Sequence, residues 1–247
     1  MIKPIHSIIR QIPSVITSLN LVTGCFSIVC AMNNQLVIAS ILIFLAGLFD
    51  FSDGFSARML KAYSEFGKSL DSLADVVSFG IAPSIIMVEL LTKAVQSSDH
   101  GFQFLQGGFW ESFEVTCGFF IAVFSAIRLA KFNIDQRQVN TFIGVPTPIN
   151  AFFIASLPIV LSRYQVMEHW ILHTYILLPL ICILSFLLVC NVPMISLKFK
   201  NYAFTGNQSK YILLGGSGLL FLFFQFSAFP LIYILYVLVS LTMKTIN

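Results

Sequence analysis

The sequence predicts an all-α fold, a polytopic transmembrane helical bundle. Of its 247 residues, 57% are hydrophobic and only 10% are charged, whereas charged residues make up about 25% of a typical soluble domain. The apolar residues gather in long runs separated by polar segments, which is the pattern of helices that cross a bilayer. The net charge of +3 is small and the basic residues are not clustered, so a nucleic-acid partner is not expected.

The chain is expected to have two parts. Residues 1–12 predict an amphipathic helix on the membrane surface, because isoleucines lie between Lys3, His6 and Arg10. Residues 13–243 predict a single transmembrane domain. Its first span is expected at 14–32. This span carries several polar residues, which usually face the interior of a bundle, so we expect it to line a cavity.

About seven further spans are expected. They are placed at 36–48, 67–91, 110–129, 149–161 and 171–190, and in the two halves of 211–243. The helix of the second span is expected to continue through Asp50 toward Met59, and Pro83 predicts a kink in the third. The run 211–243 is too long for one span, so Pro230 is expected to divide it, although the last part is short for a helix that needs about 20 residues to cross.

The basic residues predict the orientation. With eight spans, both termini lie on one side of the membrane, and 12 of the 14 Lys and Arg residues fall on that side. Only Lys93 and Arg163 fall on the other side. Because cytoplasmic loops are enriched in Lys and Arg, we expect the first set to face the cytoplasm of a cell whose cytoplasmic membrane holds this protein.

Four aspartates lie close together at residues 50–75. Asp50 and Asp53 are three residues apart, and Asp71 and Asp75 are four apart, so each pair shares one helix face. Carboxylates at a membrane boundary are costly unless something pairs with them. Two helices that present two carboxylates each form an all-oxygen site for one or two hard divalent cations, Mg²⁺ or Mn²⁺.

The residues between the aspartates complete the pattern D-x2-D-G-x2-A-R-x8-G-x3-D-x3-D. Gly54 and Ala57 are small and let a ligand approach the helix, while Arg58 offers a fork of donors to a phosphate. Gly67 leaves room on the face that carries the second aspartate pair. Metals held by carboxylates opposite an arginine indicate a diphosphate ligand. Intramembrane carboxylates also occur in ion-conducting sites and proton relays, so a metal or proton transporter is an alternative.

This pattern resembles the signature of the CDP-alcohol phosphotransferase superfamily, and every fixed residue is present. The resemblance implies a six-helix transmembrane core, a homodimer, and transfer of a substituted phosphoryl group from a CDP-linked donor to an alcohol with release of CMP. It also implies that the four aspartates bind metal and that Asp75 is the general base. The positions that line the CDP pocket are matched by Asp53, Gly54, Ala57, Arg58, Gly67 and Asp71.

Two other segments resemble those of bacterial and archaeal phosphatidylserine synthases. The opening IPSVITSLNLVTG has their P-x3-T-x2-N-x3-G arrangement, which makes Thr17 and Asn20 candidates for donor contact or for helix packing. The loop 126–148 contains RLAKFN and F-x-G-V-P-x-P, which resemble RLARFN and GLPxP. Lys131 replaces an arginine there, and Val145 replaces a leucine.

The resemblance implies CDP-diacylglycerol as donor and L-serine as acceptor. Serine has a free carboxylate, so its site needs a cation beside the metals, and Arg128, Lys131 and Arg137 are the candidates. Glycerol phosphate would also need cations. A sibling enzyme that uses glycerol phosphate or inositol is therefore a second possibility.

Overall fold

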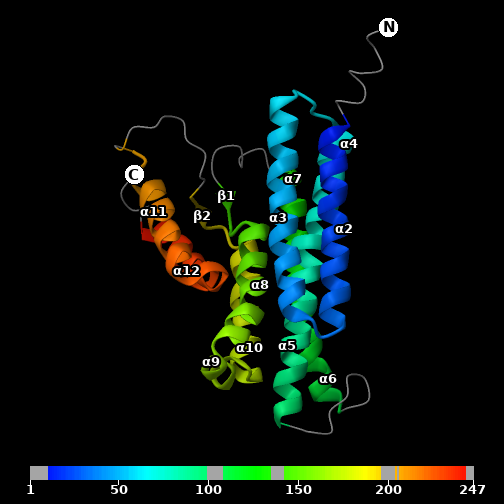
Figure 1. Ribbon diagram of the computed structural model, residues 1–247, viewed down its shortest axis with the longest axis vertical. Helices are drawn as coiled ribbons and strands as arrows, with labels where there is room; N and C mark the ends of the chain where they lie inside the picture. The colour runs from blue at the N-terminus through cyan, green and yellow to red at the C-terminus, as the bar shows by residue number, and fades with distance from the viewer. Residues whose placement is uncertain (1–10, 99–107, 135–141, 196–203, 205, 243–247) are drawn as a thin grey trace.

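The computed structural model describes residues 11–98, 108–134, 142–195, 204 and 206–242. Within these residues the chain is almost entirely helical, and most helices run alongside one another along the longest axis of the molecule (Figure 1). The predicted all-α helical bundle is therefore confirmed. The surface helix predicted at 1–12 lies almost wholly outside the described residues.

Helices α2 (Ile12–Met32) and α3 (Leu36–Met59) form an antiparallel pair joined by a tight turn (Figure 1). Asn34 makes this turn with a positive φ of 64°, a conformation that asparagine tolerates better than most residues. The buried face of α2 is polar, with Thr17, Asn20, Thr23 and Ser27, whereas its outer face is apolar. The prediction that this span turns polar residues inward is confirmed, and α3 continues to Met59 as expected.

The third span is one continuous helical run, Glu65–Ser97, with an irregular middle. It consists of α4 (Glu65–Asp75), a π-helix (Val76–Ile81) and α5 (Ala82–Ser98). Ser64 caps its start by accepting a hydrogen bond from the Gly67 N–H at 2.9 Å. The irregularity was expected at Pro83, but the π-helix begins directly after Asp75. Single π-turns inside helices are frequent at functional sites.

The fourth span, Phe109–Ile134, combines α6 (Phe109–Thr116), a 3₁₀ turn (Cys117–Phe119) and α7 (Phe120–Ile134). Two very short strands follow further along the chain, β1 (Phe142–Ile143) and β2 (Pro193–Met194), which pair antiparallel. Just after β1, Gly144 has a φ of +73°, and a side chain there would meet the Leu188 carbonyl oxygen at 2.5 Å. This close approach fixes the loop that leads into the next helix against the end of α10.

Helix α8 (Thr147–Arg163) is followed by α9 (Gln165–Ile171) and α10 (Thr174–Val189). α9 and α10 meet at an angle of 79°. α8 is the central helix of the core. It packs against α3, α5 and the C-terminal helices, and most of its residues from Asn150 to Pro158 are buried.

The C-terminal apolar run forms a helical hairpin, α11 (Gln208–Phe224) and α12 (Phe229–Thr242) (Figure 1). The division predicted at Pro230 is misplaced. The chain turns at Gln225, where φ is 53°, and Pro230 lies in the first turn of α12. Proline is tolerated there because the first N–H groups of a helix have no partner within it.

The number of membrane spans remains a prediction. Among the described residues, five helical segments are long and apolar enough to cross a membrane, and a sixth qualifies if α9 and α10 are one bent span. The hairpin α11–α12 counts as one of the five. α8 is apolar but shorter, with 17 residues.

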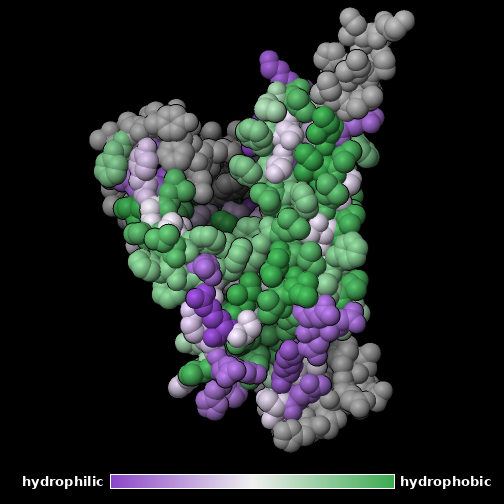
Figure 2. Space-filling view, in the orientation of Figure 1, coloured by the Kyte–Doolittle hydropathy of each residue, from purple (hydrophilic) through white to green (hydrophobic). Residues whose placement is uncertain are grey.

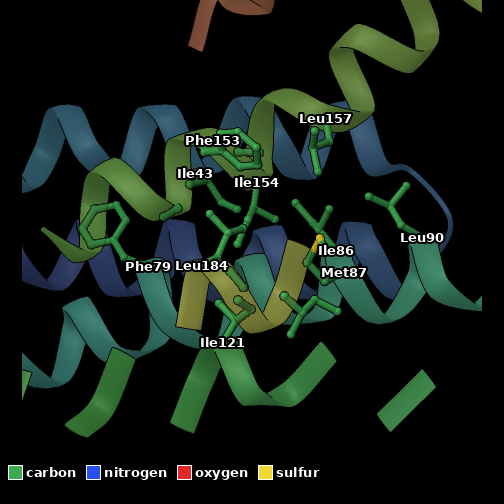
Figure 3. Close-up of a cluster of buried hydrophobic side chains, with 14 of the residues drawn as sticks. Ile43, Phe79, Ile86, Met87, Leu90, Ile121, Phe153, Ile154, Leu157 and Leu184 are labelled. Atoms are coloured by element: carbon green, nitrogen blue, oxygen red, sulfur yellow. The ribbon is translucent and has the colours of Figure 1, made fainter. Parts of the chain in front are cut away.

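The core and the outer surface are both apolar, as a lipid environment requires. Figure 3 shows the core, where Ile43 of α3, Met87 of α5 and Ile154 of α8 meet Ile121 and Leu184. On the outside, apolar residues cover the middle of the face that α2 and α3 form, and hydrophilic residues gather toward its lower end (Figure 2). This apolar band matches the surface of a protein embedded in lipid.

Candidate active site

Three of the four aspartates form one cluster. Asp50 and Asp53 lie in the last part of α3 and Asp71 lies in α4, and one carboxylate oxygen of each lies within 4.8 Å of the others. The site lies toward the end of the bundle where α2 begins and α3 ends (Figure 1). A set of carboxylate oxygens at this spacing fits the ligand preference of a hard divalent cation.

Asp75 is the last residue of α4 and does not belong to this three-residue cluster. Its carboxylate is close enough to interact electrostatically with Asp50, Asp53, Asp71 and Arg128. One of its oxygens, Oδ1, is buried and has no hydrogen-bond partner among the described residues. Asp71 Oδ1 is also buried without a partner among these residues, so Asp75 differs from the other three aspartates in lying outside their cluster.

Helix α2 holds the cluster in place through Thr17. The Thr17 hydroxyl donates to Asp53 Oδ2 at 2.6 Å and also approaches the Pro13 carbonyl oxygen at 2.9 Å. Asn20, one turn later, is fully buried, and neither polar atom of its side chain has a partner among the described residues. Its backbone carbonyl accepts a hydrogen bond from Ser78 at 3.1 Å, so α2 also contacts the π-helix behind Asp75.

A cavity of about 570 Å³ opens beside Asp53 and Asp71. Its wall also includes five more residues that the sequence assigned to the donor: Thr17, Gly54, Ala57, Arg58 and Gly67. Asn20, which was assigned to the donor as well, is not part of the wall. Further lining residues were not predicted. They come from the start of α2, from the turn between α3 and α4, and from the first turn of α4: Pro13, Ser14, Ala62, Tyr63, Ser64, Glu65 and Lys68. The sequence offered no signal for them, because their place on the wall depends on how α4 folds back.

Gly54 is part of the cavity wall, and no close packing contact requires a glycine at this position. A Cβ atom at this position would meet only the Arg58 Nη1 atom, at 3.8 Å. Glycine inside a helix costs roughly 0.5–1 kcal/mol relative to alanine. A glycine that packs against nothing is therefore better explained by the space it leaves for a ligand in the cavity.

Arg128 is a buried cation close enough to Asp75 to interact with it electrostatically. It is in α7, is only 7% exposed, and its Nη1 donates to the Thr147 hydroxyl at the start of α8 at 3.3 Å. Its guanidinium lies 5.4 Å from the centre of the Phe132 ring and interacts electrostatically with Asp75. Lys131, one turn later, is exposed. Arg137 lies outside the described residues.

The sequence of the chain matches the model of the family described as CDP-alcohol phosphatidyltransferase over residues 10–197. Among curated proteins, it is 31% identical over 193 residues to the CDP-diacylglycerol–serine O-phosphatidyltransferase of Helicobacter pylori (strain ATCC 700392 / 26695), covering 77% of this chain and 72% of the relative. The protein of that name from Bacillus subtilis (strain 168) is 32% identical over 139 residues, covering 56% of this chain and 70% of the relative.

An archaeal protein is similar as well. The archaetidylserine synthase of Methanothermobacter thermautotrophicus is 33% identical over 156 residues, covering 62% of this chain and 60% of the relative. The matched region of the family model contains the aspartate cluster, Asp75, the cavity wall and Arg128. This chain belongs to the CDP-alcohol phosphatidyltransferase family.

Proposed function

We propose that this protein transfers the phosphatidyl group of CDP-diacylglycerol to the hydroxyl of L-serine and releases CMP. The observation that carries the proposal is the position of Asp75, whose carboxylate interacts electrostatically both with the three-aspartate cluster and with the buried cation Arg128. The names of the bacterial relatives support the same donor and acceptor.

The donor is expected to occupy the cavity beside Asp53. Asp50, Asp53 and Asp71 would hold Mg²⁺ or Mn²⁺, which supplies charge to neutralise a diphosphate. Arg58 donates to the phosphate oxygens, and Gly54 and Ala57 give the nucleotide access to the helix. The acyl chains remain in the lipid that surrounds the apolar outer face.

The reaction then needs a base and a site for the acceptor. Asp75 accepts the proton of the serine hydroxyl through its unpaired oxygen. The hydroxyl oxygen bonds to the lipid-side phosphorus, and the bond from that phosphorus to the CMP oxygen breaks, so that CMP leaves with the electron pair. Arg128 attracts the serine carboxylate, while Lys131 and Arg137 are proposed as outer contacts of the acceptor.

An acceptor screen tests the function. The purified protein is given CDP-diacylglycerol with Mg²⁺ or Mn²⁺, and CMP release is measured with serine, glycerol phosphate or inositol. Release that depends on serine supports the proposal. Release with another alcohol alone would indicate a sibling enzyme, and no release with any alcohol would favour a transporter that uses the same carboxylates.

Replacing Arg128 by alanine is expected to raise the KM for serine by about 10-fold or more, because a hydrogen bond to a charged group is worth roughly 1.5–3 kcal/mol. The KM for CDP-diacylglycerol is expected to change little. Steady-state CMP release at varied serine and varied donor separates the two. Arg163→Ala is the control, because Arg163 ends α8 at its exposed end. An equal rise in both KM values for Arg128→Ala would show that Arg128 does not serve the acceptor.

Replacing Gly54 by alanine is expected to have opposite effects on stability and on donor binding. The free energy of unfolding should rise by roughly 0.5–1 kcal/mol, because alanine favours the helix and the added methyl meets no wall. The KM for CDP-diacylglycerol should rise because that methyl enters the cavity. Gly215→Ala is the matched control, since Gly215 is likewise inside a helix, a Cβ there meets nothing within 4 Å, and Gly215 is not part of the cavity wall. An unchanged donor KM for Gly54→Ala would place the nucleotide elsewhere.

We also infer that the protein is a homodimer in the cytoplasmic membrane with the aspartate cluster facing the cytoplasm. The resemblance to the family supports the dimer, and the distribution of Lys and Arg supports the orientation. Crosslinking in intact membranes tests the first. The orientation is tested with a Lys68→Cys variant and a membrane-impermeant maleimide. The variant should be labelled more than the parent protein only after the cells are opened.

A further inference from the structure

Buried polar side chains from α7, α8 and α12 form a connected set around Arg128, and none of them is part of the wall of the donor cavity. Arg128 of α7 donates to Thr147, and Asn150 lies three residues after Thr147 on the same face of α8. The Tyr233 hydroxyl of α12 donates to Asn150 Oδ1 at 3.3 Å. Tyr236, three residues further along α12, is buried in the neighbourhood of Arg128. These five residues connect the acceptor side of the site to the C-terminal hairpin.

Helix α12 is held firmly in this position. The Tyr236 hydroxyl donates to the Ile195 carbonyl oxygen at 3.2 Å, and the Ile195 N–H donates to the Ser240 hydroxyl at 3.2 Å. The Tyr233 ring also lies 4.9 Å from the Phe153 ring of α8. In Figure 1 the hairpin lies on the opposite side of α8 from α2 and α3. It also lies beyond residues 10–197, the part of the chain that the family model matches.

Two hydrogen-bond donors in this set are buried without an acceptor among the described residues. They are Arg128 Nε and Asn150 Nδ2, in side chains that are 7% and 0% exposed. Leaving a buried donor unsatisfied is costly, and more so for a charged group. Two such donors in one connected set indicate that an acceptor arrives with the ligand. A carboxylate supplies two acceptor oxygens and a charge that balances the guanidinium.

We propose that Asn150 and Arg128 together bind the carboxylate of the acceptor, and that Tyr233 and Tyr236 of α12 position them. This inference rests on the proposed transfer to an amino alcohol with a carboxylate. Because the Tyr233 hydroxyl occupies Asn150 Oδ1, the amide presents its NH₂ group to the ligand. Tyr236 fixes the segment around Ile195 by donating to the Ile195 carbonyl oxygen. Asn150 and Arg128 together make the site selective for serine over ethanolamine, which is the same amino alcohol without the carboxylate.

The decisive variant is Asn150→Asp. It keeps the size of the side chain and the acceptor for Tyr233, but it replaces the NH₂ donor by an oxygen that repels a carboxylate. The KM for serine is expected to rise by about 100-fold, as for a lost charged hydrogen bond combined with like-charge repulsion. The KM for CDP-diacylglycerol should not change, and CMP release with ethanolamine should not fall. The serine-to-ethanolamine ratio of kcat/KM is therefore the readout.

Tyr233→Phe tests the positioning role without changing a ligand contact. Removing one neutral hydrogen bond should raise the KM for serine by roughly 3- to 10-fold and lower the serine-to-ethanolamine ratio, while kcat is retained. Tyr175→Phe is the matched control, because Tyr175 is exposed in the first turn of α10. If Asn150→Asp does not fold, the ratio for Tyr233→Phe alone decides.

The outcomes separate this inference from the function on which it rests. If the unchanged protein releases no CMP with serine, the proposed function fails and this inference fails with it. If it uses serine but both variants keep the serine-to-ethanolamine ratio, only the role of Asn150 and α12 is overturned, and water satisfies the two donors instead. A parallel rise of the donor and serine KM values would likewise overturn it, because that pattern reports a general structural change.

Discussion

Replacing Asp75 by asparagine should lower the rate of CMP release by about 100- to 10,000-fold, the usual contribution of a positioned general base. Asparagine has the same size as aspartate but cannot accept the proton of the serine hydroxyl. Asp71 and Asp75 each have a buried carboxylate oxygen without a partner among the described residues, and Asp75 is suited to that step because it lies outside the three-residue cluster. The measurement is kcat at saturating serine and CDP-diacylglycerol.

Binding experiments show whether the loss is chemical. Asp75→Asn should still bind CDP-diacylglycerol, since the cavity wall does not include Asp75. Glu114→Gln is a matched control, because it removes a carboxylate from α6, which does not contribute to the cavity. A kcat for Asp75→Asn near that of the unchanged protein would rule out Asp75 as the base.

Most residues that the sequence assigned to the donor lie close together because they are near neighbours on α3 and α4. The spacing of three between Asp50 and Asp53 fixes a shared face once the segment is helical, and α3 is helical through Met59. The inward direction of Thr17 followed from a polar residue within an apolar span. What the spacing did not reveal was that the Thr17 hydroxyl donates directly to Asp53, because this contact joins residues 36 positions apart.

Irregular backbone was the main feature that the sequence did not predict. The two-residue strands β1 and β2 are too short to show an alternating pattern, and their pairing joins segments far apart in the chain. The π-helix after Asp75 packs very closely against α2. A methyl group at Gly24 of α2 would collide with Ser78 of the π-helix. The turn at Gln225 uses a positive φ in a residue that rarely adopts it, so Pro230 was the more visible but wrong signal.

The surroundings of Arg128 were not predicted, for the same reason. Arg128 was singled out from its local motif, and it is buried and interacts electrostatically with Asp75. Nothing in the sequence indicated that Thr147 and Asn150 of α8 and Tyr233 of α12 lie near it. The contact between Asn150 and Tyr233 spans 83 positions, and helical periodicity gives the buried face of each helix but not which helices meet.

The second large effect is expected from Asp53, the most deeply buried residue of the aspartate cluster. Asp53→Asn removes one charged oxygen ligand, so the site should bind Mn²⁺ far more weakly, and CMP release should fall to background at the concentration that saturates the unchanged protein. Removing divalent ions with EDTA should have the same effect, and adding Mn²⁺ should reverse it. Manganese binding is measured directly by electron paramagnetic resonance, which does not depend on turnover.

Thr17 distinguishes weaker metal binding from a failure to fold. Thr17→Val keeps the shape of the side chain but removes the hydroxyl that donates to Asp53 at 2.6 Å, whereas Thr17→Ser keeps this donor. Residues that orient a metal ligand typically change metal affinity by about 10- to 100-fold. Thr17→Val should therefore raise the Mn²⁺ concentration for half-maximal activity by that factor, with recovery of kcat at high Mn²⁺. Thr17→Ser should behave as the unchanged protein does. If Thr17→Val and Thr17→Ser required the same Mn²⁺ concentration, the hydrogen bond to Asp53 would not orient a metal ligand, and Thr17 would serve only the packing of α2 and the wall of the cavity.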